Sequence, residues 1–127
     1  MHIGIDGNEA NITKRVGIGE YAFELLSQLH KILQVEKTHK VTVYLKHTPI
    51  SDMPFPYEAW NYKIVRPAKL WTQFGLPLHL FLSGSKPDIF FTPTHYSPRF
   101  SPVPTVVSIM DLSFIHFPEL FAKSDLY

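Results

Sequence analysis

Two aspartates of this chain each follow a short apolar run. Asp6 comes directly after residues 3–5, and Asp111 comes directly after residues 105–110. A carboxylate at the end of a buried strand can hold a substrate hydroxyl or orient a neighbouring group. The alternative for both aspartates is a turn or a helix cap, which is a common role of this residue type.

A histidine and a phenol stand together in a third loop of this kind. His95 and Tyr96 follow residues 89–91, within the stretch Pro93-Thr94-His95-Tyr96. This pair could transfer a proton or stack against a sugar ring. A single loop histidine with no chemical role is the commoner case, so we retain both interpretations.

Two glycines mark a possible anion site. Gly17 and Gly19 stand where a loop enters the clearest helix of the sequence, and Arg15 precedes them. Bare backbone amides at the positive end of a helix can bind a phosphate. The glycines could equally serve the turn alone, because two glycines some ten residues after a strand are not the dinucleotide fingerprint.

Composition excludes several classes of protein. The net charge of +1 gives no basic excess for nucleic acid, and the absence of cysteine removes disulfides and thiolate chemistry. The sequence lacks a glycine-flanked nucleophilic serine, a His-Glu-x-x-His pair and a phosphate-binding loop. We expect a cytoplasmic protein, since no signal peptide or membrane span is evident.

The elements that must position these residues alternate between strands and helices. Apolar residues at three- and four-residue spacing predict a helix from Ile18 to Leu33. A second, shorter helix is predicted over residues 71–82, with Pro77 near its first turn. Strands are predicted over residues 3–5, 41–45, 62–65, 89–91 and 105–110.

This order predicts an α/β fold, a Rossmann-like open and mostly parallel sheet with helices on both faces. Residues 105–110 have the continuous apolar character of a strand that is buried on both sides. Ligands of such sheets gather beyond the carboxyl ends of the strands, so the loops that carry Asp6, His95 and Asp111 are the candidate sites.

Four segments in this order resemble a known family. The segments are Ile3-Gly4-Ile5-Asp6, Val16-Gly17-Ile18-Gly19-Glu20-Tyr21, Pro87-Asp88-Ile89-Phe90-Phe91-Thr92-Pro93, and residues 106–112 leading to Phe117-Pro118-Glu119. Together they resemble the N-terminal domain of retaining GT-B glycosyltransferases, the group with bacterial mannosyltransferases and glycogen-synthase-like enzymes. The resemblance covers essentially the whole chain.

The resemblance implies transfer of a sugar, with retention, from a nucleotide diphosphate sugar to a hydroxyl acceptor. It implies that Gly17 and Gly19, with Arg15 beside them, approach the donor diphosphate. It places Asp6, Tyr96 and Met110 on the acceptor side of the cleft and gives Asp111 a catalytic role. Met110 stands where the family has histidine, and His95 is the candidate substitute. No metal or other cofactor is implied, because the nucleotide sugar is a co-substrate.

The resemblance also implies that residues 1–127 are one acceptor-side domain that is incomplete at its C-terminal end. The donor-binding domain would then be a missing partner, and apolar residues between 114 and 126 would lack cover. The expected partners are a nucleotide sugar and a sugar or lipid-linked acceptor, with no nucleic acid. Peripheral membrane contact through residues 71–82 is less favoured than a core-facing helix. The alternative function is a non-catalytic α/β binding or regulatory module derived from the same fold.

Overall fold

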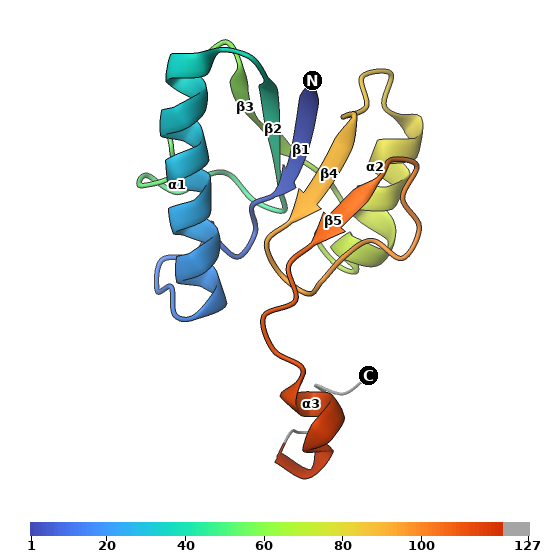
Figure 1. Ribbon diagram of the computed structural model, residues 1–127. Helices are drawn as coiled ribbons and strands as arrows, with labels where there is room; N and C mark the ends of the chain where they lie inside the picture. Colours follow the sequence, from blue (N-terminus) through green and yellow to red (C-terminus); the bar gives the residue numbers. More distant parts are fainter. Residues whose placement is uncertain (121–127) are drawn as a thin grey trace.

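The computed structural model of the protein describes residues 1–120 (Figure 1). A five-stranded sheet forms its centre, in the order β3-β2-β1-β4-β5, and every neighbouring pair of these strands is parallel. This arrangement confirms the predicted open α/β fold. The strands are β1 (His2–Asp6), β2 (Lys40–Leu45), β3 (Trp60–Ile64), β4 (Ile89–Thr92) and β5 (Thr105–Val107).

Helix α1 (Ile18–Glu36) covers one face of the sheet. It buries Ala22, Leu26 and Leu33 at the predicted helical spacing, and these side chains form one core with residues of β1, β2 and β3. The helix extends past the predicted end at Leu33 and stops at Lys37, whose φ of 53° places it in the left-handed region.

The opposite face is covered by a π-helical turn, Trp71–Gly75, that continues into α2 (Leu76–Leu82). These two pieces together span the predicted helix, and Pro77 lies in the first turn of α2 as expected. Their inner side chains pack with Tyr44 and Phe90 into a second core. Gly4 lies beneath this core, where a Cβ atom would come within 2.9 Å of the Phe90 ring.

The outer side of the same helical segment is also apolar. Phe74, Leu78 and Phe81 are each more than half exposed, although Trp71 and Leu80 on the inner side are buried. The segment is therefore core-facing as expected, and in addition it presents an apolar stripe to solvent. None of the helices formed by residues 1–120 is long and apolar enough to cross a membrane.

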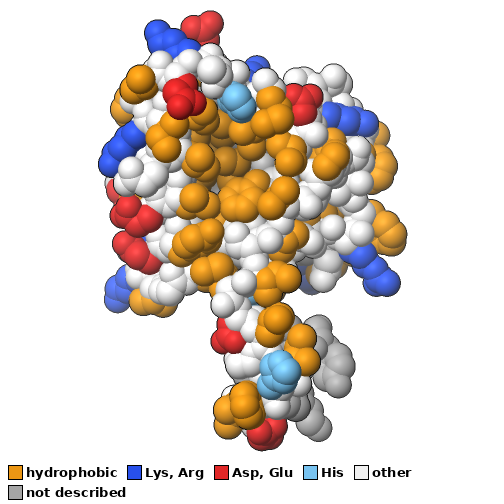
Figure 2. Space-filling model, in the orientation of Figure 1, with side chains coloured by type: hydrophobic (Ala, Val, Ile, Leu, Met, Phe, Trp, Pro, Cys, Tyr) orange, Lys and Arg blue, Asp and Glu red, His pale blue; other side chains and the backbone are white. Residues whose placement is uncertain are grey.

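Strand β5 differs from its prediction. It ends at Val107 instead of Met110, and Val106, Ile109 and Met110 are about half exposed or more. The cause is that no helix of the described residues packs over this edge of the sheet. The pairing of β4 with β5 places Val106 beside Phe91, on the face of the sheet that α1 covers. Helix α1 lies over β1 to β3 and does not reach β5. Figure 2 shows the resulting group of apolar side chains over the middle of the molecule, between α1 and β5.

Beyond β5 the chain leaves the sheet. It forms the short helix α3 (Ser113–His116) and a 3₁₀ turn, Pro118–Leu120, apart from the rest of the molecule (Figure 1). Ile115, Phe117 and Leu120 are exposed, as expected for apolar residues without cover. The part of that expectation that concerns residues 121–126 lies outside the described residues.

Candidate functional site

The crevice at the carboxyl ends of the strands is the candidate functional site. β1 is the central strand, and the chain reaches β2 on one side of it and β4 on the other, so the loops after β1 and β4 diverge there. Open parallel sheets bind ligands at such a point. A cavity of about 170 Å³ lies here, and we call it the Asp6 cavity. It is lined by Asp6, Asn8, Glu9, Lys46, Thr72, Thr94 and Tyr96.

Asp6 is the buried carboxyl group of this cavity, with 7% of its surface exposed. Its Oδ1 atom accepts hydrogen bonds from the backbone N–H of Asn8 at 3.0 Å and from the Asn8 amide at 2.6 Å. Asn8 in turn accepts a bond from the backbone N–H of Lys46, at 2.7 Å, which ties the loop after β1 to the end of β2. Oδ2 of Asp6 has no hydrogen-bond partner within residues 1–120 and remains for a ligand.

Burial gives Asp6 unusual acid–base properties. It raises the pKa of the carboxyl from 3.8 to about 6, even though the bonds from Asn8 and the charge of Lys46 favour the ionised form. A carboxyl group with this pKa changes charge just below neutral pH. It can therefore accept a hydrogen bond from a hydroxyl, and it can take up a proton, under ordinary conditions.

Tyr96 and His95 lie at the mouth of the crevice. Their rings are 4.1 Å apart between centroids, and Tyr96 is more than half exposed. The backbone of this loop is fixed by the Thr92 hydroxyl, which donates to the Tyr96 carbonyl oxygen at 2.9 Å. A second cavity, of about 360 Å³, contains both rings and shares Lys46, Thr72 and Tyr96 with the Asp6 cavity. The predicted residues Asp6, His95 and Tyr96 therefore belong to one site.

The start of α1 adjoins this site. Gly17 has a φ of 51°, a conformation that favours glycine, and no side chain caps the helix. A Cβ atom at Gly19 would lie 3.1 Å from the carbonyl oxygen of Glu9, which itself lines the Asp6 cavity. Gly17 thus permits the positive φ at which the chain enters the helix, and Gly19 allows the loop after β1 to pass close to the helix end.

Arg15 is engaged elsewhere. Its guanidinium forms two bonds with the carboxylate of Asp52, at 2.6 and 2.9 Å, and its Nε–H donates to the Ala10 carbonyl oxygen. The same group lies 3.8 Å from the centroid of the Phe23 ring. These contacts hold Arg15 in a structural position, outside the residues that line the Asp6 cavity.

Met110 and Asp111 also lie outside the Asp6 cavity. Both are exposed, in the irregular stretch after β5. The Asp111 carboxylate accepts bonds from the Ser113 backbone at 2.6 Å and from the Ser113 hydroxyl at 2.8 Å, and these bonds lower its pKa. The geometry is that of a turn residue ahead of α3.

Sequence reasoning missed Lys46, Asn8 and Thr72. The signal for Lys46 was present, because it directly follows the second strand just as Asp6 ends the first. Within residues 1–120 no three histidine, aspartate or glutamate side chains group in a way that could hold a metal ion. Comparison of the chain with protein-family models, curated proteins and solved structures finds no match.

Proposed function

We propose that this chain is the acceptor-side domain of a glycosyltransferase that moves a sugar from a nucleotide sugar to a hydroxyl group with retention. The observation that carries the proposal is the convergence at one crevice of a buried carboxyl, Asp6, and an exposed ring pair, His95 and Tyr96. Carboxylates and aromatic faces are the groups by which proteins hold sugars: the first binds hydroxyls and the second binds the apolar side of the ring.

In this proposal an acceptor sugar stacks on Tyr96, and one of its hydroxyl groups, other than the one that reacts, donates a hydrogen bond to the free Oδ2 atom of Asp6. The acceptor oxygen forms the new bond to the anomeric carbon as the bond from that carbon to the diphosphate breaks. The acceptor proton passes to the departing diphosphate. Backbone N–H groups of Gly17 and Ile18, at the positive end of the 19-residue helix α1, would stabilise the negative charge that develops there, whereas the N–H of Gly19 already donates to the Val16 carbonyl oxygen at 3.1 Å.

A second domain completes the reaction in this proposal. Its role is to bind the nucleotide sugar and to supply basic groups for the diphosphate, which the described crevice offers only in Lys46. Residues 1–127 alone are then expected to bind acceptor and to show no transfer. Turnover of UDP-glucose or GDP-mannose by residues 1–127 alone would contradict this division of labour.

Amide chemical shifts on titration with methyl α-mannoside and methyl α-glucoside test the acceptor site. We expect shifts in residues 6–8 and 94–97 that weaken in Asp6→Asn and in Tyr96→Ala. Asp52→Asn is the matched control, since it removes a carboxylate outside the cavity. If the glycosides leave this crevice unperturbed, the acceptor assignment is wrong.

A non-catalytic binding module of the same fold is the second candidate. It is favoured by the positions of Met110 and Asp111, which lie outside the Asp6 cavity, with Asp111 engaged by Ser113. Deletion of the gene separates the two: loss of a glycosylated product, measured by mass spectrometry of the cell's glycans, supports the transferase. Unchanged glycans combined with glycoside binding support the module.

A further inference from the structure

A second cavity, of about 150 Å³, lies on the α2 face of the sheet, toward the amino ends of β1 and β2. Its floor comes from three adjacent strands. Register pairs His2 with Lys40 and Thr42 with Asn61, and Lys63 follows two residues later on β3, so that all five side chains share one face. His79 of α2 forms a wall. We call this the lysine cavity.

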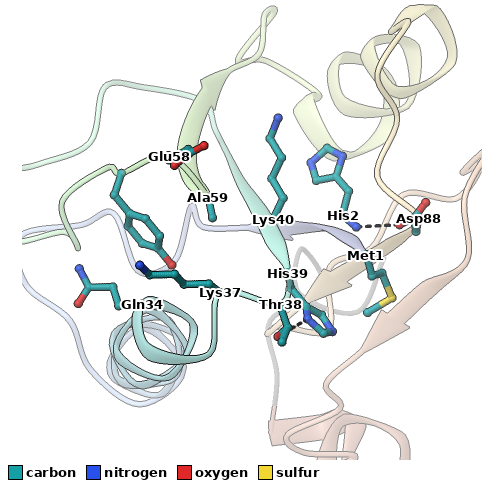
Figure 3. A pocket seen from close by; sticks show the side chains of 11 residues that line it. Met1, His2, Gln34, Lys37, Thr38, His39, Lys40, Glu58, Ala59 and Asp88 are labelled. Atoms are coloured by element: carbon teal, nitrogen blue, oxygen red, sulfur yellow. Dashed lines mark hydrogen bonds between the residues drawn. The ribbon is translucent and has the colours of Figure 1, made fainter.

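The charge of the lysine cavity is positive and unbalanced. Lys40 and Lys63 supply this charge, His2 and His79 also line the cavity, and no aspartate or glutamate lines it within the described residues. The one ion pair formed by residues 1–120, Arg15 with Asp52, involves neither lysine. Figure 3 shows the side chains of Lys40 and His2 pointing to the same side of the sheet.

The sequence around the lysine cavity also carries a net positive charge. Between Ala59 and Pro87 the chain contains three lysines and one arginine and no acidic residue. Glu58 and Asp88 each lie three residues from a lining residue of the cavity, and both line a neighbouring cavity that shares Lys40 and His2 with it. The Asp88 carboxylate is already bonded to the backbone N–H of His2 at 2.7 Å. Burial lowers the pKa of His2, and the charge of Lys40 lowers it further, against opposing contributions from the backbone of Lys86 and the charge of Asp88. Burial and then the charge of Lys63 lower the pKa of His79.

Hydrogen bonds leave one set of side-chain donors in this cavity without a partner among the described residues. The Thr42 hydroxyl donates to Oδ1 of Asn61 at 3.1 Å, so it accepts a bond from Nε2 of His2, which lies 2.8 Å away. Because Oδ1 of Asn61 is occupied, its amide N–H groups are the part of that side chain that is free. They have no partner within residues 1–120.

We propose that the lysine cavity binds a phosphate group, held by the ammonium groups of Lys40 and Lys63 and the amide of Asn61. Lysine binds phosphate as a compact charge, and amide donors add direction. The volume is well below the several hundred cubic ångströms of a site for a drug-sized ligand, so it fits a phosphate group and not a whole nucleotide.

Two sources of this phosphate are compatible with the site: a free anion or the head group of a phospholipid. The second source has support from α2, which contributes His79 to the cavity and presents Leu78, Phe81 and Leu82 to solvent. Exposed apolar side chains beside a basic surface are the combination by which interfacial helices bind anionic membranes.

The first arm of the test uses inorganic phosphate, titrated at constant ionic strength and followed by amide chemical shifts. We expect shifts at residues 40–42, 61–63 and 83–85, and a loss of at least tenfold in affinity in Lys63→Gln and in Lys40→Gln. Lys31→Gln on α1 is the matched control and should bind as the wild type does. Shifts that persist unchanged in both cavity variants would overturn the proposal.

The second arm measures sedimentation with phosphatidylcholine vesicles that contain or lack phosphatidylglycerol. Binding that requires phosphatidylglycerol and Lys63, and that weakens in Phe81→Ser, identifies a lipid head group. Phosphate binding without vesicle binding identifies a free anion. If the protein binds neither probe while its amide spectrum remains that of a folded protein, the proposal is wrong. These outcomes do not depend on the glycoside titration, because the two cavities share no lining residue.

Discussion

The Asp6 cavity and the lysine cavity are nearly equal in volume and opposite in character. The first, of about 170 Å³, surrounds a buried carboxyl whose pKa is raised to about 6. The second, of about 150 Å³, has two lysines and two histidines and no acidic side chain among the described residues that line it. β1 contributes to both, since Asp6 and His2 are the two ends of one five-residue strand.

This difference teaches that a parallel sheet can offer separate recognition chemistries at separate places. Size does not distinguish the two cavities, so the groups that line them must. A carboxyl beside exposed rings suits a neutral, hydroxyl-rich ligand, whereas unpaired ammonium groups suit an oxyanion. Burial should raise the pKa of Asp6 in the first cavity and lower the pKa of His79 in the second.

Asp6→Asn is expected to have the largest effect, and it should stabilise the protein. The folded-state pKa of Asp6 lies above its ordinary value, so its contribution to stability is fully present below about pH 4 and is lost as pH rises through about 6. Above that pH the ionised, buried carboxylate costs roughly 3 kcal/mol. The variant keeps an acceptor oxygen for Asn8 and avoids this cost.

Urea unfolding of both proteins at pH 4 and pH 7.5 checks this. The free energies of unfolding should be similar at pH 4, and that of the variant should be higher by 2–3 kcal/mol, roughly, at pH 7.5. Asp52→Asn, which removes an exposed carboxylate, should show no such gain. A variant that is less stable than the wild type at pH 7.5 would mean that Asp6 is ionised at little cost.

Thr42→Val tests the hydrogen bonds beneath the lysine cavity and should have a smaller effect. The change removes the donor to Asn61 and the partner of His2 while nearly preserving volume. We expect a loss of about 1–2 kcal/mol in the free energy of unfolding. Thr38→Val, at an exposed position whose hydroxyl bonds to the neighbouring His39 ring, is the control and should change it little. Equal effects in both variants would contradict the role given to Thr42.

Lys63→Gln should have the smallest effect, a rise in the pKa of His79. The positive charge of Lys63 lowers this pKa, but burial is the larger cause, so the value should stay below that of a free histidine. Titration of the imidazole proton resonances measures it. Lys31→Gln should leave the pKa of His79 where it is in the wild type. An unchanged value in Lys63→Gln would show that the two groups do not interact.

Much of the fold could be predicted because local pattern and tertiary structure agree there. The helical spacing that ends at Leu33 includes the buried residues Ala22, Leu26 and Leu33, although Tyr21 and Ile32 stay exposed, and residues 41–45 form a strand as predicted. Agreement fails at residues 108–110, where apolar composition indicated a buried strand. Whether these residues form a strand depends on a neighbouring strand to pair with and on a helix to pack over them, and neither is encoded within the segment itself.

The Asp6 cavity could be predicted in part, and the lysine cavity could not. Asp6 and Tyr96 were found because Asp6 ends β1 and Tyr96 lies in the loop after β4, and parallel strands bring such positions to one edge. The lysine cavity depends on register, which sets Thr42 beside Asn61 and therefore Lys40 and Lys63 on one face. A shift of one residue in that register would have moved Lys63 to the other face of β3, and single-strand patterns do not specify it.

The division of the sheet between two cores has a consequence for the newly made chain. The buried residues of the α1-side core all lie between Ile5 and Trp60, whereas the α2-side core requires Phe90. Because chains are made from the N-terminus at some 5–20 residues per second, the first core can pack on the ribosome several seconds before β4 is available. During that interval one edge of β1 has no partner strand, and this is when the nascent protein is most open to pairing with the wrong segment.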